Sequence, residues 1–277
     1  MSEVNLEWAA QAELGEGPLW VAHENALYFV DILRHTVNRL SISDGAKTSW
    51  SFDAPVTSLA ERERGGFVCT IIDGFAALDL EGRRTVAMQL PETHLPGNRF
   101  NDGKVDGTGR YWAGSMSYDL ASESGSLYRL DGDGSVHVMD RNYIIANGPA
   151  FSPCGRVVYH NDSRKRSVYA FKLNEDGTLS DKRVLVKFEA ESEGVPDGLT
   201  VDEQGDLWQA SFGGGRVTCY APTGEVKAVV ELPAPNVTSC TFGGAELDTL
   251  YMTTARCLMS EEDLKNYPLA GGLFSVR

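Results

Sequence analysis

The chain has 277 residues, a formal net charge of −14, 42% hydrophobic residues and 23% charged residues. This composition predicts a folded, soluble protein, and no apolar run approaches the roughly 20 residues that a membrane-spanning helix needs. The excess of acidic residues argues against nucleic acid and against an anionic membrane as partners, because both select basic protein surfaces.

The cysteines and the N-terminal segment indicate the compartment. The five cysteines are odd in number, scattered and without a Cys-x-x-Cys spacing. This favours small core residues in a reducing environment over a disulfide or zinc framework. The N-terminal segment lacks a basic region followed by an apolar stretch, so we expect no signal peptide. Together these features predict a cytoplasmic protein.

One sequence phrase recurs about six times along the chain. Its clearest copy is DGLTVDEQGDLW at residues 197–208. In chain order, the six copies begin near Glu16, Thr57, Asn101, Asn147, Asp197 and Ser239, 41 to 50 residues apart. A repeat of this length that is rich in short strands is typical of a β-propeller. We therefore predict an all-β, six-bladed propeller formed as a single domain by residues 1–277.

Each repeat predicts four strands. The first begins at the start of the phrase, and the second carries a pair such as Leu207-Trp208. The third has an alternating pattern such as SLYRL at residues 126–130, and the fourth precedes the next copy of the phrase. Turn sequences such as DGDG at residues 131–134 separate the later strands.

Two features are expected near the chain ends. Residues 260–265 predict a short helix, because Ser260 is a good N-cap and acidic residues suit a first helical turn. Residues 7–10 and 272–276 are expected to share one sheet. This pairing would close the ring and leave no sheet edge open.

Polar side chains occupy the same position in four of the repeats. Asn101, Asn147 and Asp197 each lie eight residues before the glycine that precedes the second strand, and Glu16 falls within about a residue of the same place. In a propeller, these positions meet near the central channel. Their oxygen atoms suit calcium, magnesium or manganese, or else zinc or ferrous iron. Asp-Gly and Asn-Gly are also common turn formers, but Glu16 is a poor turn residue, so the full set favours a metal site.

Several longer segments resemble the regucalcin/gluconolactonase family. They are residues 15–20 (GEGPLW), 98–106 (NRFNDGKVD), 111–116 (YWAGSM), 146–148, 196–198, 213–217, 238–244 and 270–274. These segments occur in order along essentially the whole chain. The resemblance implies a six-bladed propeller that hydrolyses sugar lactones with one divalent metal ion in its channel. It leaves open whether that ion is Ca²⁺, Zn²⁺, Mn²⁺ or Fe²⁺.

The resemblance also implies roles for individual residues. Glu16, Asn147 and Asp197 match the metal ligands of the family. Arg99 and Asn101 match residues that bind the oxygen atoms of the substrate, so Asn101 is assigned to the substrate rather than to the metal. Asp197 is expected to act as well as the base that takes a proton from the attacking water.

The chain departs from the family after residues 111–116. Some members carry there a glutamate that reaches the sugar, whereas this chain reads Ser117-Tyr118-Asp119. Either Asp119 binds the substrate with a shorter reach, or Tyr118 lines the pocket. The departure leaves the identity of the sugar open.

The predicted function is therefore metal-dependent hydrolysis of a small-molecule sugar lactone to its aldonic acid. One alternative is a regucalcin-like calcium-binding regulatory protein without significant turnover, although such a protein needs no substrate-orienting Arg99. Another is an interaction scaffold, which needs no charged channel. A broader esterase or organophosphate hydrolase would want a more apolar pocket than Arg99, Asn101 and Asp119 provide. A monomer is expected, because a propeller needs no partner to close.

Overall fold

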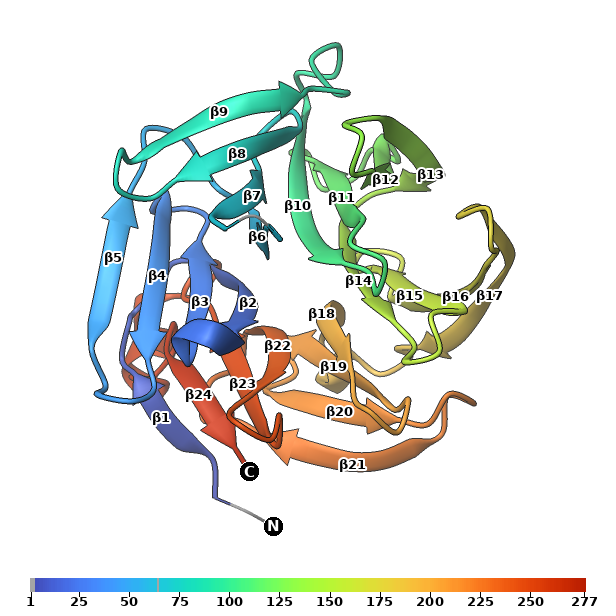
Figure 1. Cartoon of the computed structure of the whole chain (residues 1–277). Helices are drawn as coiled ribbons and strands as arrows, with labels where there is room; N and C mark the ends of the chain where they lie inside the picture. The colour runs from blue at the N-terminus through green and yellow to red at the C-terminus, as the bar shows by residue number, and fades with distance from the viewer. Residues whose placement is uncertain (1–2, 64) are drawn as a thin grey trace.

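A computed structural model describes residues 3–63 and 65–277. Within these residues the strands form six four-stranded antiparallel sheets around a central axis, which confirms the predicted six-bladed β-propeller (Figure 1). Met1 and Ser2 lie outside the described residues. They are the first residues of the N-terminal segment in which no signal peptide is expected. Among the described residues, no helix is long and apolar enough to cross a membrane.

The first three blades follow the chain in order. Blade 1 contains β2 (Gly15–Val21), β3 (Ala26–Asp31), β4 (Thr36–Ser41) and β5 (Lys47–Ser51). Blade 2 contains β6 (Ser58–Glu61), β7 (Phe67–Thr70), β8 (Phe75–Asp79) and β9 (Arg84–Gln89). Blade 3 contains β10 (Asn98–Val105), β11 (Tyr111–Ser117), β12 (Gly125–Leu130) and β13 (Val136–Tyr143).

The last three blades complete the ring. Blade 4 contains β14 (Ala146–Phe151), β15 (Val157–Asp162), β16 (Ser167–Leu173) and β17 (Leu179–Lys187). Blade 5 contains β18 (Val195–Val201), β19 (Leu207–Phe212), β20 (Arg216–Tyr220) and β21 (Val226–Glu231). Blade 6 contains β22 (Val237–Gly243), β23 (Thr249–Thr254), β24 (Leu273–Val276) and the N-terminal β1 (Asn5–Trp8).

The repeated phrase forms the innermost strand of each blade. These strands, β2, β6, β10, β14, β18 and β22, surround the centre of the ring in Figure 1. The phrase also contains a structural aspartate. Asp106 and Asp202 each accept a hydrogen bond of 2.8 Å from an indole N–H on the next strand, that of Trp112 or of Trp208. This bond joins the first two strands of a blade, which explains why Asp and Trp recur at this spacing.

The two chain ends close the ring, as predicted, although the N-terminal strand covers Asn5–Trp8 rather than residues 7–10. β1 pairs with β24 in antiparallel fashion, with Asn5 opposite Ser275 and Trp8 opposite Leu273. The Trp8 ring packs edge-on against Phe29 of blade 1, at 5.5 Å between ring centroids. The closing strand therefore belongs to the blade 6 sheet and also contacts blade 1, so no gap is left between the two blades.

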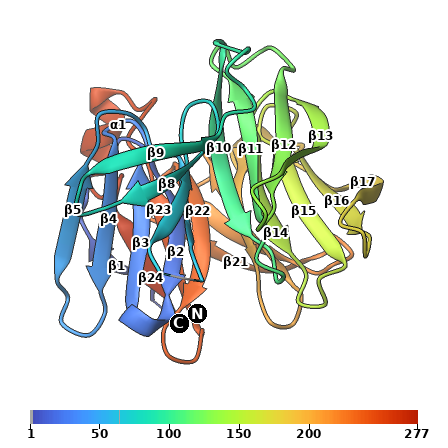
Figure 2. The same ribbon diagram turned by 45° about the horizontal axis from the view of Figure 1, so that its top comes forward.

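The predicted helix is present as α1 (Glu261–Asn266), and the Ser260 hydroxyl accepts a hydrogen bond of 3.1 Å from the Asp263 amide. Figure 2 shows α1 at the end of the molecule where the inner strands begin, and Leu264 of α1 packs against the hydrophobic core shared by blades 5 and 6. Two single-turn 3₁₀ helices, η1 (Ala22–Glu24) and η2 (Glu191–Glu193), complete the helical structure of the described residues.

All five cysteines are free, so none forms a disulfide. The prediction that they are core residues is confirmed for Cys69, Cys219 and Cys240, which are buried. It is wrong for Cys154, which is exposed on a turn, and for Cys257, which is partly exposed on the loop after β23. A thiol is small and weakly polar, so either environment can accommodate it.

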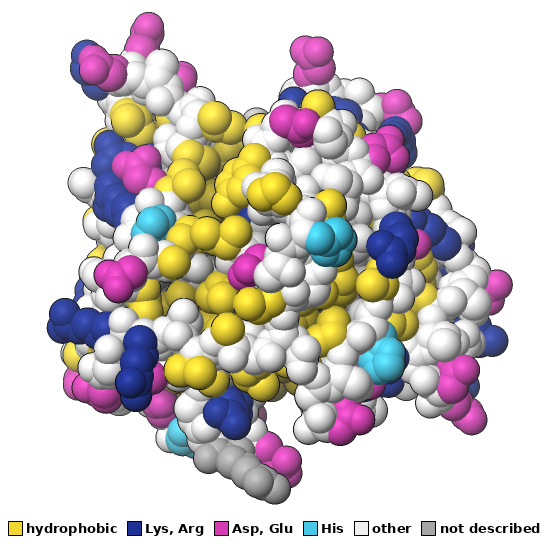
Figure 3. All heavy atoms as spheres, turned by 90° about the horizontal axis from the view of Figure 1, so that it is seen from above, with side chains coloured by type: hydrophobic (Ala, Val, Ile, Leu, Met, Phe, Trp, Pro, Cys, Tyr) yellow, Lys and Arg dark blue, Asp and Glu magenta, His cyan; other side chains and the backbone are white. Residues whose placement is uncertain are grey.

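One side of the ring carries hydrophobic side chains at its surface. Figure 3 shows the side at the top of Figure 1, where β9 lies, with hydrophobic side chains gathered in the middle. Val86 and Met88 of β9 are 54% and 43% exposed. Basic side chains on this face are separated from one another by acidic, polar and hydrophobic ones (Figure 3).

Candidate metal and substrate site

Each inner strand that carries a predicted site residue contains a β-bulge next to that residue. The register shifts lie between Glu16 and Leu19 in β2, Phe100 and Gly103 in β10, Asn147 and Ala150 in β14, and Pro196 and Leu199 in β18. A bulge interrupts the alternation of a strand and re-aims its side chains. Gly148 has φ +86°, a conformation that favours glycine and permits the bulge after Asn147.

Glu16, Asn147 and Asp197 are only 4%, 1% and 7% exposed. Burial raises the pKa of Glu16, and the neighbouring charge of Asp197 raises it further. The pKa of Asp197 is also raised, mainly by burial and then by the charge of Asp102. Buried carboxylates of like charge are costly unless a cation compensates them. This donor set, two carboxylates and an amide oxygen, therefore fits a divalent cation.

The side chain of Asn147 is oriented by hydrogen bonds on both sides. Its amide nitrogen donates to the Ser163 hydroxyl at 2.8 Å, and its oxygen accepts from the Asn101 amide nitrogen at 2.8 Å. Because a carbonyl oxygen has two lone pairs, the Asn147 oxygen keeps one lone pair that can bind a metal ion. Ser163 thus fixes the amide with its oxygen toward Asn101, as expected for a group that supports a metal ligand.

Asn101 lies between Asn147 and Arg99. The Arg99 guanidinium donates to the Asn101 oxygen at 2.7 Å and to the Phe100 carbonyl at 2.9 Å. The Asn101 amide nitrogen faces Asn147 instead, so the oxygen of Asn101 is held away from the Asn147 oxygen. The assignment of Asn101 to the substrate remains a prediction.

Asp119 is not brought into contact with this group. Its carboxylate accepts hydrogen bonds from the Ala121 and Ser122 amides, at 2.9 and 2.8 Å, and from the Ser122 hydroxyl at 2.5 Å. These bonds hold the pKa of the exposed Asp119 well below its usual range. By contrast, Tyr118 is 51% exposed and lies close enough to Arg99 to affect the pKa of the guanidinium.

Asp102 is a site residue that sequence reasoning missed. It is 6% exposed, and its carboxylate accepts hydrogen bonds from the Gly103 amide at 2.8 Å and, across the blade boundary, from the Gly148 amide at 2.9 Å. Burial raises the pKa of Asp102 to about 6, and Lys104 acts in the opposite direction. The one sequence feature that could have indicated Asp102 is its position next to Asn101. Simple alternation would have pointed it away from the channel, whereas the bulge turns it inward.

Cys257 is a second residue that the sequence did not indicate. Burial raises the pKa of its thiol to about 12, and the charges of Asp197 and Glu16 act in the same direction. Its amide donates a hydrogen bond of 2.9 Å to the Glu13 carbonyl, so the loop that carries Cys257 lies against the segment before β2. Only the tertiary structure brings this loop to the segment before β2.

A separate group of possible ligands lies in blade 5. Asp202, Asp206 and Cys219 have ligand atoms within 4.8 Å of one another. However, Asp202 already accepts the Trp208 indole N–H and the Asp206 amide, and Asp206 is paired with Lys227. These bonds give the two carboxylates structural partners, so the channel group is the better candidate for a metal.

The fold and this group define a class of protein, a six-bladed propeller with a buried acidic channel and an arginine beside it. The chain belongs to the family described as the SMP-30/gluconolactonase/LRE-like region, whose sequence model matches residues 14–256. Recognition of the regucalcin/gluconolactonase family from the sequence is thereby confirmed.

Individual relatives cover nearly the whole chain. A 6-deoxy-6-sulfogluconolactonase of Pseudomonas putida is 36% identical over 264 residues, which are 95% of this chain and 91% of that protein. Regucalcin of Oryctolagus cuniculus is 38% identical and covers 100% of this chain and 95% of its own length. The crystal structure of a calcium-binding protein, regucalcin, of Agrobacterium tumefaciens has a TM-score of 0.94 at 25% identity, over 99% of this chain and 93% of that one.

Proposed function

We propose that the protein is a metal-dependent hydrolase that converts a sugar (aldono) lactone into its aldonic acid. The observation that carries the proposal is the hydrogen-bonded chain from Arg99 through Asn101 to Asn147, beside the carboxylates of Glu16 and Asp197. This arrangement joins a metal-binding group to a substrate-orienting arginine. The family, and the lactonase among its members, supports the same reaction class.

Each residue then has a chemical role. Glu16, Asn147 and Asp197 would hold one divalent cation, which polarises the lactone carbonyl and lowers the pKa of a bound water when present. Asp197 would accept a proton from the attacking water. Arg99 and Asn101 would orient the sugar, and Arg99 would stabilise the negative charge that develops on the substrate.

The charges of the channel support this role. Glu16, Asp197 and Asp102 supply three buried carboxylates, Arg99 supplies a buried cation and Lys104 supplies a half-buried one. With all of them ionised the channel carries −1, and a divalent cation changes this to +1. A positive site favours the anionic transition state of ester hydrolysis over the neutral lactone.

A second candidate function is a regucalcin-like calcium-binding regulatory protein without significant turnover. The relatives named regucalcin, at 38% identity, favour it. It would use the same metal-binding residues but would leave Arg99 without a role. The two functions therefore differ in whether bound metal is accompanied by hydrolysis.

The deciding experiment is hydrolysis of a panel of five- and six-membered aldonolactones by metal-stripped protein. Ca²⁺, Zn²⁺, Mn²⁺, Fe²⁺ and Mg²⁺ would be added back one at a time, while acid release is followed near neutral pH. Metal-dependent turnover would support the lactonase and would identify both the sugar and the ion. Tight metal binding without turnover of any lactone would favour the regulatory protein.

We also infer that the protein acts as a cytoplasmic monomer formed by a single domain, residues 1–277. Its five free cysteines suit a reducing compartment. Its ring is closed by its own two ends, so that no partner is needed to complete a sheet. Size-exclusion chromatography with light scattering would check the monomer, and a mass near 60 kDa, twice the 30.2 kDa of one chain, would contradict it.

A further inference from the structure

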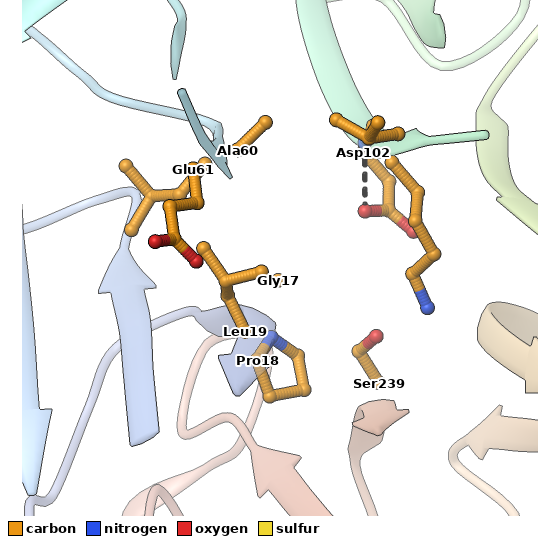
Figure 4. Close-up of a pocket in the computed structure, with 11 residues that line it drawn as sticks. Gly17, Pro18, Leu19, Ala60, Glu61, Asp102 and Ser239 are labelled. Atoms are coloured by element: carbon orange, nitrogen blue, oxygen red, sulfur yellow. Dashed lines mark hydrogen bonds between the residues drawn. The ribbon is translucent and has the colours of Figure 1, made fainter. Parts of the chain in front are cut away.

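A cavity of about 260 Å³ lies between the inner strands of blades 1, 2, 3 and 6 (Figure 4). The described residues that line it include Gly17, Asp102 and Ser239 but none of the predicted metal or substrate residues. Arg99 lies near the start of β10, before the part of that strand that lines the cavity. The groups that hold Arg99 therefore lie around the start of β10, outside this cavity.

A buried carboxylate lies at this place, in the loop between blades 2 and 3. Glu92 is 2% exposed, and burial raises its pKa. One of its oxygens accepts hydrogen bonds from the Ser115 hydroxyl at 2.6 Å and the Tyr128 hydroxyl at 2.9 Å, and the other accepts from the Asn98 amide nitrogen at 3.2 Å. A buried carboxylate is costly unless hydrogen bonds compensate it, and a well-bonded buried network is rigid. Glu92 therefore fixes the groups that it binds.

Two of these groups flank Arg99 in the blade 3 sheet. Asn98 directly precedes Arg99 on β10. Ser115 lies on β11 next to Met116, which is the residue that pairs with Arg99. Glu92 thus binds one neighbour of each member of the Arg99–Met116 pair. Its hydrogen bonds go to neighbours of the arginine, so it acts on the guanidinium through the two strands.

The Asn98 amide has only one favourable orientation. Its oxygen accepts a hydrogen bond from the Ser124 hydroxyl at 2.6 Å, and its nitrogen donates to the Ser124 carbonyl at 3.2 Å as well as to Glu92. A rotated amide would place its oxygen against the Ser124 carbonyl. The bond between Asn98 and Glu92 therefore needs an acceptor at residue 92.

We propose that Glu92 is a positioning residue for Arg99, which it aims at Asn101 and at the sugar by fixing the start of β10 against β11. The inference rests on the proposed lactonase function. Arg99 is 9% exposed, and its guanidinium reaches the Asn101 oxygen at 2.7 Å. A displacement of about 1 Å in a group that orients a substrate can cost about 100-fold in rate, so the direction of this side chain matters.

Glu92→Gln tests the link to Asn98. If the glutamine oxygen keeps the two hydroxyl bonds, its amide nitrogen faces the Asn98 amide nitrogen, and two donors are left without an acceptor. We expect KM for the lactone to rise at least about tenfold, kcat to fall by a smaller factor and the metal Kd to stay within about twofold. Glu81→Gln, exposed in the turn between β8 and β9, is the matched control and should behave as wild type.

The double variant Glu92→Gln/Asn98→Asp exchanges donor and acceptor and keeps the net charge. We expect its KM to return to within about threefold of wild type. Asn98→Asp alone places two carboxylates together and should raise KM at least as much as Glu92→Gln. If Glu92→Gln does not fold, Ser115→Ala removes the link to β11 and should raise KM at least about threefold. A lower Tm with unchanged KM in these variants would overturn the positioning role.

Crystal structures give a readout other than activity. We expect the hydrogen bond between Arg99 and Asn101 in the wild type and in the double variant, and its loss in Glu92→Gln. An unmoved Arg99 in Glu92→Gln would overturn the positioning role and leave the lactonase function intact. Wild-type protein that binds metal but hydrolyses no lactone would instead refute the proposed function, while the crystal structures would still decide whether Glu92 positions Arg99.

Discussion

At the scale of single residues, Asp197 has two proposed tasks. It would hold the metal and also accept a proton from the attacking water. Burial and the charge of Asp102 both raise its pKa, so its carboxylate is a stronger base than an exposed one. Its backbone carbonyl accepts hydrogen bonds from Asn161 at 2.6 Å and from Gln209 at 2.8 Å, which fix its position in β18.

We predict that Asp197→Asn lowers kcat by a factor of about 10² to 10⁴, the usual contribution of a general base. Metal binding should largely remain, because asparagine keeps an oxygen ligand. Steady-state kinetics and calorimetric metal titration would check both parts. Asp176→Asn, in the exposed turn before Thr178, is the matched control and should behave as wild type. Near-normal turnover of Asp197→Asn would refute its role as the base.

Ser163 tests whether Asn147 is a metal ligand. Ser163→Ala removes the hydrogen bond that orients the Asn147 amide, so we expect the metal Kd to rise about 10- to 100-fold, as for other residues that support ligands. At a saturating metal concentration, the kcat of Ser163→Ala should return to the wild-type value. Ser43→Ala, on an exposed loop, provides the control. An unchanged Kd in calorimetry would show that Asn147 does not bind the ion.

At the scale of elements, the β-bulges of the inner strands build the site. They occur next to Glu16 in β2, Asn101 in β10, Asn147 in β14 and Asp197 in β18. Asp102, in the bulge of β10, bonds the Gly148 amide in the bulge of β14 and so ties two neighbouring blades together. The site is thus assembled from irregular positions held by regular sheets.

The closing strand β1 offers a test of the ring. Trp8→Ala removes the ring that packs on Phe29, and we expect the free energy of unfolding to fall by about 2 kcal/mol, less than for a fully buried tryptophan. Urea denaturation would measure the change. Asn5→Ala, exposed on the same strand, should change it by less than about 0.5 kcal/mol. Equal stability of the two variants would show that Trp8 does not hold the closure.

At the scale of the whole molecule, the acidic channel links metal binding to pH. The pKa values of Glu16, Asp197 and Asp102 are all raised in the folded protein, that of Asp102 to about 6. The folded, metal-free protein therefore binds more protons than the unfolded chain between about pH 4 and these raised values. The contribution of these three carboxyl groups to the stability of the metal-free protein is therefore fully present below that range and is lost as pH rises through it.

We predict that a divalent cation reverses this loss. Protons compete with the metal for the same carboxylates, so the difference in Tm between metal-loaded and chelator-treated protein should grow from pH 5 to pH 8. At a metal concentration of about 1,000 Kd, binding stabilises the fold by about 4 kcal/mol, which corresponds to roughly 10 °C. Differential scanning calorimetry would measure both forms. A difference that does not change with pH would contradict metal binding by Glu16 and Asp197.

The sequence by itself determined the fold and named four candidate residues of the site. The repeat places one equivalent strand in each blade, and a closed ring must bring equivalent positions together at its centre. Glu16, Asn101, Asn147 and Asp197 could be found in this way because their spacing to the second strand is a local property. Pairing of the two ends could be anticipated because an open sheet edge is unfavourable.

Only the tertiary structure decided which further groups face the channel. The inward turn of Asp102 depends on a bulge, which breaks the period of two on which strand predictions rest. Ser163, Cys257 and Ser239 come from other strands and loops. The Asp119 carboxylate accepts hydrogen bonds within its own turn and does not contact the site. These features follow from packing between blades far apart in the chain, which no local pattern records.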